Sequence, residues 1–174
     1  MNKRLTFLVI ASLIFSACAL IPKKTVQIKW PENIQYIEAL CELDISLKDM
    51  KYSGPMSLKL EYPDMLMIDV FGPFGDTVVH INKNKDTFLL VTKEGSTSSE
   101  IGFEQDFGIK LSDFIEDLAF NPCRKGCAGN ELIQRDNYKI KYNLEGSNDK
   151  SICWEIKDGS MCITFIETKF EKQE

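Results

Sequence analysis

The sequence predicts an α+β domain, in which a curved antiparallel sheet is covered by helices on its concave face. Apolar and polar residues alternate with a period of two over several short segments, and turn residues separate these segments, as in sequential antiparallel strands. Two other segments have an apolar stripe at helical spacing. A sheet of about nine strands curls. Helices with one apolar face can therefore cover its inner side.

Length and composition restrict the function. The 174 residues carry a formal charge of −5 and suit one domain with an extension. This acidic balance gives no electrostatic footprint for nucleic acid, and the arginines, Arg4, Arg124 and Arg135, offer few clamps for phosphates. With one histidine, His80, a histidine-rich metal site is excluded and a catalytic triad is disfavoured. We expect a protein that is not an enzyme and holds no cofactor or metal.

The first segment is typical of a secretory signal. A basic start, Met1–Arg4, precedes an apolar run from Leu5 to Phe15 that is too short to span a bilayer comfortably. Small residues then precede Cys18, which resembles the lipobox of bacterial lipoproteins. The resemblance implies a signal peptide over 1–17, a diacylglycerol on the Cys18 thiol and a lipid-anchored tether over 18–28.

Two other interpretations of this segment stay open. Cleavage after Ala19 would release a soluble secreted protein, and an uncleaved segment from Leu5 to Ile21 would remain as an anchor. If Cys18 is acylated, the following residue is Ala19 and not aspartate. By resemblance to known sorting rules, this favours the outer membrane, with the protein facing the periplasm.

The remaining residues, 29–174, are expected to form the single domain. Pro31 opens a predicted helix in which Ile34, Ile37, Leu40 and Cys41 share one stripe. The pattern then changes to a period of two. The predicted strands are Leu43–Leu47, Met56–Tyr62, Met65–Phe71, Thr77–Ile81 and Thr87–Val91.

The second half again has one predicted helix followed by predicted strands. The polar segment from Glu94 to Glu100 is expected to be a loop or a weak edge strand. Ser112 can cap a second helix, which ends before Pro122. The apolar face of that helix comprises Leu111, Phe114, Ile115, Leu118 and Ala119. The last predicted strands are Leu132–Arg135, Tyr138–Leu144, Ser151–Lys157 and Met161–Phe170.

Five cysteines follow Cys18, and we favour structural roles for them over a redox or metal role. Cys123 and Cys127 could close a local loop, but their spacing is not that of a thiol oxidoreductase. Cys153 and Cys162 flank a turn. If Asp158-Gly159 forms that turn, the two cysteines lie on a diagonal, and a disulfide needs a shift in register. Cys41 is expected to be buried as a small apolar residue.

Other chemistry-bearing residues have ordinary structural interpretations. His80 is expected on a face of the sheet and not in a site. Asp69 and its neighbours in sequence, Asp64 and Asp76, lack the partners that acid–base catalysis or a calcium loop requires. Trp30 and Trp154 could line a binding surface, but packing in the core is the more common role of such residues.

The candidate functional segment runs from Ser53 to Gly75. Two apolar strands lie here, and they are followed by the turn Gly72-Pro73-Phe74-Gly75. Their residues can line a cavity for acyl chains or pack as a plain core. The candidate cavity residues are Met56, Leu58, Leu60, Leu66, Ile68 and Val70. Phe74 can protrude to engage a membrane, or fold back on the sheet as part of an ordinary turn.

This segment, together with the lead-in Phe107–Ser112 to the second helix, resembles the outer-membrane lipoprotein receptor family (LolB-type) and its LolA-like relatives. The resemblance implies an incomplete β-barrel whose concave face is covered by two or three helices. It also implies a cavity for lipoprotein acyl chains and a protruding apolar residue, here Phe74, that delivers them into the inner leaflet of the outer membrane. A periplasmic carrier protein would be the partner that supplies the cargo.

Three functions follow, in order of expectation. The first is a lipid-anchored protein that binds lipoprotein acyl chains and assists their insertion into the outer membrane. The second is an envelope assembly protein that scaffolds a protein partner without a lipid ligand. The third is an enzyme that uses Cys123 or Cys127, which would need a free thiol of low pKa.

Overall fold

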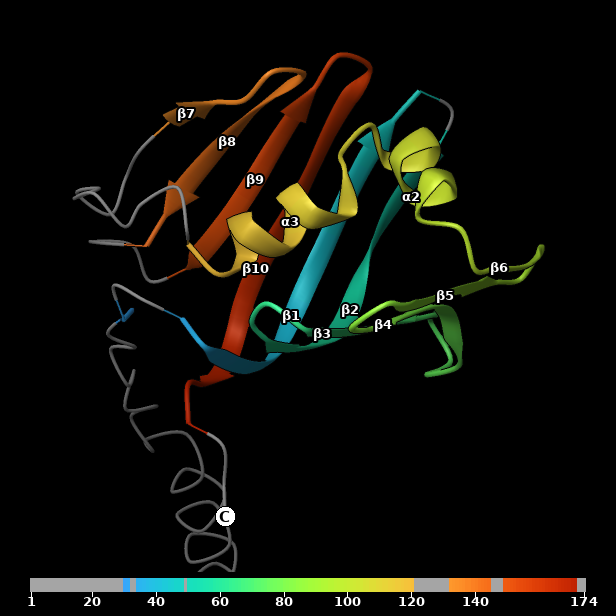
Figure 1. Ribbon diagram of the computed structural model, residues 1–174, viewed down its shortest axis with the longest axis horizontal. Helices are drawn as coiled ribbons and strands as arrows, with labels where there is room; N and C mark the ends of the chain where they lie inside the picture. The colour runs from blue at the N-terminus through green and yellow to red at the C-terminus, as the bar shows by residue number, and fades with distance from the viewer. Residues whose placement is uncertain (1–29, 32–33, 49, 121–131, 145–148, 172–174) are drawn as a thin grey trace, which may run out of the picture.

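The chain folds around a single open antiparallel sheet. A computed structural model describes residues 30–31, 34–48, 50–120, 132–144 and 149–171. Within these residues the sheet has ten strands in the order β6-β5-β4-β3-β2-β1-β10-β9-β8-β7, and two helices lie in front of it (Figure 1). The first and last of these described strands, β1 and β10, therefore pair near the centre of the sheet.

The elements have the following bounds. The strands of the first half are β1 Tyr36–Leu47, β2 Met50–Glu61, β3 Met65–Phe71, β4 Thr77–Asn84, β5 Thr87–Thr92 and β6 Gly95–Thr97. The helices are α2 Glu100–Phe107 and α3 Leu111–Leu118. The strands of the second half are β7 Leu132–Gln134, β8 Tyr138–Asn143, β9 Lys150–Ile156 and β10 Gly159–Lys169.

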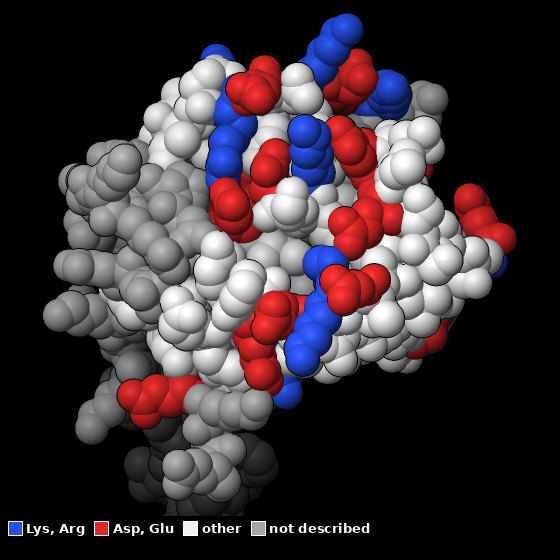
Figure 2. All heavy atoms as spheres, in the orientation of Figure 1, with Lys and Arg blue, Asp and Glu red and all other residues white. Residues whose placement is uncertain are grey.

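The core lies between the sheet and the helices. Alternate residues of the strands are buried, because successive side chains point to opposite faces of a sheet. They form one hydrophobic cluster with Phe103 of α2 and with Phe114 and Leu118 of α3. The outer surface on this side is dotted with acidic and basic side chains (Figure 2). Helix α3 has a distinct apolar face toward this core, whereas α2 contributes the single buried residue Phe103.

The predicted helix that begins at Pro31 is wrong. Residues from Tyr36 onward belong to β1, where Ile37 and Cys41 are buried while Leu40 is 50% exposed. Residues that are four apart share a face in a strand as well as in a helix, so Ile37 and Cys41 fit the helical period and the strand period equally well. Pairing with β2 on one side and β10 on the other determines the outcome.

The predicted class is confirmed only in its antiparallel sheet. The described part of the chain is mostly β, since the expected first helix is a strand and each of the two helices present has eight residues. Helix α2 was not expected. Helix α3 has the predicted apolar face, but its N-cap is Lys110 and no side chain caps it. Ser112 lies inside the first turn, so the predicted capping role is wrong.

The other predicted strands are confirmed in place, with differences at their ends. The largest extensions are those of β4, which continues through the polar residues to Asn84, and of β2, which begins at Met50. The polar segment after Glu94 contains the short edge strand β6. The opposite edge of the sheet is formed by β7, which is equally short.

The disulfide in the last hairpin corrects the predicted register. Ile156 pairs with Gly159, so the turn residues are Lys157 and Asp158. Cys153 and Cys162 are then directly opposite each other, with Cα atoms 4.1 Å apart, and they form a disulfide. The expected diagonal placement was wrong because it assumed a turn at Asp158-Gly159, one residue later than the observed turn. Cys123 and Cys127 lie outside the described residues.

Cys41 is buried and free, as expected. Its thiol should therefore make the folded protein less stable at alkaline pH. Burial raises the pKa of its thiol from 9.0 to about 12. Between these values the unfolded chain has lost the thiol proton and the folded chain keeps it. The free energy of unfolding should therefore fall above pH 9, by up to about 1.4 kcal/mol per pH unit from this group. In Cys41→Ala, urea unfolding at several pH values should show a shallower decline. An equally steep decline would contradict this assignment.

Candidate functional site

The turn between β3 and β4 presents a large apolar side chain to solvent. The N–H of Gly75 donates to the carbonyl of Gly72 at 2.9 Å, and the N–H of Gly72 donates to the carbonyl of Asp76 at 2.7 Å. Gly75 has a φ of +82°, which favours glycine. At the tip, Phe74 is 96% exposed. It does not fold back on the sheet, so the ordinary interpretation of this turn is wrong.

The six candidate cavity residues lie together on the helix-covered face. They form three cross-strand pairs between β2 and β3, namely Met56 with Val70, Leu58 with Ile68 and Leu60 with Leu66. Each is at most 4% exposed. They form part of the packed core beneath α2 and α3. In this conformation an acyl chain could reach them only if part of the helical layer moved.

Helix α2 is the more weakly held part of that layer. Of its eight residues, all described, only Phe103 is buried, and Ile101 is 65% exposed. The Phe103 ring packs on Phe107 at 4.8 Å and on Phe114 of α3 at 5.6 Å between centroids. Phe107 is partly buried against the core, and Glu100 of α2 pairs with Lys83 of β4 at 2.7 Å. Because α2 buries one residue and α3 buries five, α2 can separate from the sheet at a smaller cost than α3.

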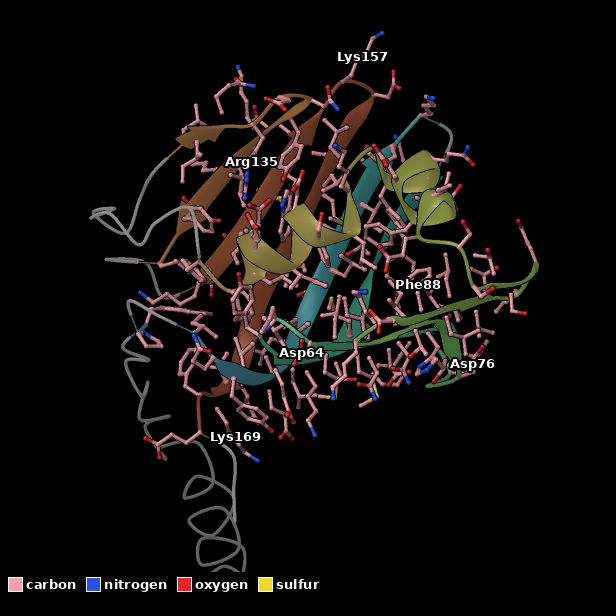
Figure 3. All side chains as sticks on the ribbon, viewed as in Figure 1. Asp64, Asp76, Phe88, Arg135, Lys157 and Lys169 are labelled. Atoms are coloured by element: carbon pink, nitrogen blue, oxygen red, sulfur yellow. A yellow bond between two sulfur atoms is a disulfide. The ribbon has the colours of Figure 1, made fainter. Side chains whose placement is uncertain are left out.

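Helix α3 is held by a buried carboxylate that sequence reasoning missed. Asp117 is fully buried and accepts hydrogen bonds at Oδ2 from Tyr138 (2.7 Å) and from Trp154 Nε1 (3.0 Å). Arg135, which points from the β7–β8 turn toward α3, donates to Oδ1 through Nη2 (2.6 Å) and Nε (3.2 Å) (Figure 3). The main-chain carbonyl of Asp117 accepts a hydrogen bond from the Tyr142 hydroxyl at 3.1 Å. The network joins α3 to β8 and β9.

The electrostatics of this network favour an ion pair. Burial raises the pKa of Asp117 above its ordinary value, and the hydrogen bonds from Tyr138, Arg135 and Trp154 offset only part of this rise. Burial by itself lowers the pKa of Arg135, but the hydrogen bond and the charge of Asp117 raise it by more, so the net shift is upward. Because these neighbours aim donors at the carboxyl, we assign the charged form to Asp117. The sequence signal was an acidic residue beside the apolar face of α3.

The opposite, convex face of the sheet holds a hollow of about 410 Å³. Asp69 of β3 and His80 of β4 are directly paired across the strands, and Asp69 Oδ1 lies 2.7 Å from His80 Nδ1. Both are half-buried. The hollow is lined by Asp69, Thr77, Val78, His80, Val91, Thr92 and Lys93. His80 does lie on a sheet face, as expected, but Asp69 has a partner that the sequence did not reveal.

Lys93 lies at the end of this hollow nearest the exposed turn. Its Nζ is 3.4 Å from Asp76 Oδ2, and Asp76 follows Gly75 directly. Both members of this ion pair are largely exposed, so it contributes little to stability and can exchange for other partners. The turn that carries Phe74 therefore lies at the end of β4 where the lining of the hollow begins, at Thr77.

Both tryptophans pack in or against the core, as expected. Trp154 is fully buried, which confirms its core role. Trp30 is partly buried, and its ring packs on Phe165 at 4.7 Å and on Phe170 at 5.0 Å between centroids. Cys18, the signal peptide and the tether precede the described residues and remain predictions.

No family model matches the sequence, and no curated protein is significantly similar to it. Among the described residues, no group of three or more His, Cys, Asp and Glu side chains is placed to hold a metal ion. The helices that the structure describes are all too short or too polar to cross a membrane.

Proposed function

We propose that the protein is a lipid-anchored envelope protein that receives lipoprotein acyl chains on the concave face of its sheet and assists their insertion into the outer membrane. The proposal extends to an incomplete barrel, with the helices as its cover, and to a periplasmic carrier protein as the source of cargo. Anchoring through Cys18 would place the domain at the inner leaflet. No covalent chemistry is required.

The observation that carries the proposal is the exposure of Phe74. A phenylalanine that is 96% exposed at the tip of a turn gains about 1.5–3 kcal/mol when its side chain enters hydrocarbon. The hydrogen bonds within the turn hold it outward without help from the core. One such residue gives weak, reversible contact, which suits a protein that must release its cargo at a membrane.

The concave face supports acyl binding through its composition. Methionine, leucine and isoleucine at adjacent positions of β2 and β3 give a continuous apolar surface. Under this proposal α2 separates from the sheet, and acyl chains replace Phe103 against that surface. Transfer then follows the burial of apolar area, first in the protein and next in the bilayer, at about 25 cal/mol per Å².

Replacing Phe74 by glutamate should impair delivery and leave folding and cargo binding intact. A charge at this position opposes entry into hydrocarbon, while the exposed side chain contributes nothing to the core. The measurement is transfer of an acylated lipoprotein from its carrier to vesicles bearing the full chain. Phe74→Leu should retain transfer.

A matched control separates position from charge. Leu132→Glu makes the same kind of change at a residue that is 61% exposed on the edge strand β7, remote from the turn in the sheet order. This variant should deliver normally. Normal delivery by Phe74→Glu, or an equal loss in Leu132→Glu, would exclude the proposed role of the turn.

A scaffold without a lipid ligand is the second candidate, and the packing of the concave face favours it. Side chains of α2 and α3 lie in one core with the residues proposed to bind acyl chains. Native mass spectrometry distinguishes the two functions, on the chain with Cys18 replaced and purified from an envelope-exporting host. Co-purified lipid or acylated peptide supports the carrier. A mass without ligand that does not change on adding acylated peptide supports the scaffold.

A further inference from the structure

We propose that Trp30 and Thr168 donate hydrogen bonds to the ester carbonyl of a lipoprotein acyl chain that lies on the concave face. This inference rests on the proposed function and adds the chemical group by which the cargo is held. Among the described residues, two buried side-chain polar atoms have no hydrogen-bond partner, Nε1 of Trp30 and Oγ1 of Thr168. Such atoms are costly, because each has given up its bonds to water.

The two atoms belong to one part of the core. The indole ring of Trp30 lies 4.7 Å from the ring of Phe165 and 5.0 Å from that of Phe170, measured between centroids. Thr168 comes between these phenylalanines on the terminal part of the chain, and its partner across the strands is the buried Ala39. Trp30 therefore contacts a residue on each side of Thr168, at the end of the sheet where β1 begins and β10 ends (Figure 1).

This part of the core continues the surface that we propose for acyl chains. Cross-strand pairing places Thr168 beside Ala39, Ala39 beside Leu58, and Leu58 beside Ile68. Leu58 and Ile68 are two of the six candidate cavity residues. Neighbouring strands are about 4.8 Å apart, so Thr168 lies about 10 Å from Leu58 along this row. An acyl chain that crosses β3, β2 and β1 would therefore bring one of its ends to Thr168.

The surroundings of the two atoms favour a neutral acceptor. An indole N–H can only donate, and a hydroxyl can do so. The rings of Phe120, Phe165 and Phe170 pack against Trp30, so a charged ligand would be costly here. A carbonyl oxygen has two lone pairs and no net charge, so one carbonyl can accept from both donors. In an acylated lipoprotein, the ester carbonyl is the polar group joined directly to the hydrocarbon chain.

Competition between two acylated peptides tests the inference. Each peptide has an N-terminal cysteine with a glycerol group on its sulfur, and the glycerol carries palmitoyl esters in one peptide and hexadecyl ethers in the other. The ether peptide lacks only the carbonyl oxygens. Because the peptides differ in mass, native mass spectrometry of the chain with Cys18 replaced measures both complexes in one sample. The ester peptide should be preferred by about 2- to 10-fold, as expected for one net hydrogen bond.

Two variants remove the donors one at a time. Trp30→Phe removes the N–H and keeps an aromatic ring, and Thr168→Val removes the hydroxyl with little change in volume. The ester preference should fall in each variant and disappear in the double variant. A loss of packing alone would weaken both peptides alike and leave their ratio unchanged. The matched control is Thr164→Val, the same change on β10 at a residue paired with the exposed Glu42, and it should retain the full preference.

Equal binding of the two peptides, or an ester preference that persists in the double variant, would overturn the inference. Either result leaves the carrier function in place, since the peptides still bind. If neither peptide binds, the proposed function fails and the inference fails with it. Phospholipids carry the same esters, so a second pair, phosphatidylcholine with ester or ether chains, distinguishes the sources. An ester preference in the phospholipid pair alone would overturn the role of Trp30 and Thr168 in holding lipoprotein cargo.

Discussion

Replacing Asp117 by alanine should lower the free energy of unfolding by about 3–5 kcal/mol, as expected when one partner of a buried ion pair is removed. The variant leaves the guanidinium of Arg135 without its main acceptor. The hydroxyl of Tyr138 and the indole N–H of Trp154 also lose their acceptor in the core. Unsatisfied buried donors add to the cost. Urea unfolding followed by tryptophan fluorescence measures the change.

Glu116→Ala is the matched control, because Glu116 bonds to the same guanidinium at 3.3 Å but its side chain is 44% exposed. An exposed pair of this kind contributes at most about 1 kcal/mol. If the two variants lost similar stability, Asp117 would not be the residue that fixes α3 to β8 and β9.

Replacing Gly159 by alanine should be at least as damaging, with a loss of about 4 kcal/mol or failure to fold. An added Cβ would lie 1.8 Å from the carbonyl oxygen of Ser46 and 3.0 Å from Cα of Leu47. Both obstacles are backbone atoms of β1 and cannot rotate away. Gly159 also has a φ of +153°, which side-chain-bearing residues rarely adopt.

Gly95→Ala separates the clash of an added Cβ with β1 from the strain of a positive φ. Gly95 has nearly the same φ, +149°, but an added Cβ would meet nothing within 4 Å. Its loss should therefore reflect backbone strain alone, about 1–3 kcal/mol. Thermal unfolding of both variants gives the comparison. Equal losses would show that the contact with Ser46 contributes nothing.

The strands were predictable because their signal is local. In β3, bounded by Pro63-Asp64 and Gly72-Pro73, the apolar run and its turn residues lie within a few positions of one another. The start of β1 was not predictable in the same way. Its period was ambiguous, and the pairing that decides it joins the first strand to the last one in the chain.

In the candidate site, too, the local features were predictable and the long-range contacts were not. Glycine and proline predicted the turn that carries Phe74, although only the structure shows that its side chain points outward. The Asp117 network joins groups 18 to 37 residues apart in the sequence. The Asp69–His80 pair depends on the register of two strands. Such juxtapositions have no local pattern, so the sequence could not reveal them.

The shortness of the two edge strands affects how copies of the protein meet. An open sheet can grow by adding a strand from another molecule, because its outermost backbone groups lack partners. Here β6 and β7 have three residues each, so an incoming chain would find a ladder too short to hold it. The sheet can therefore stay open along its edges without serving as a template for strand addition when copies of the protein meet.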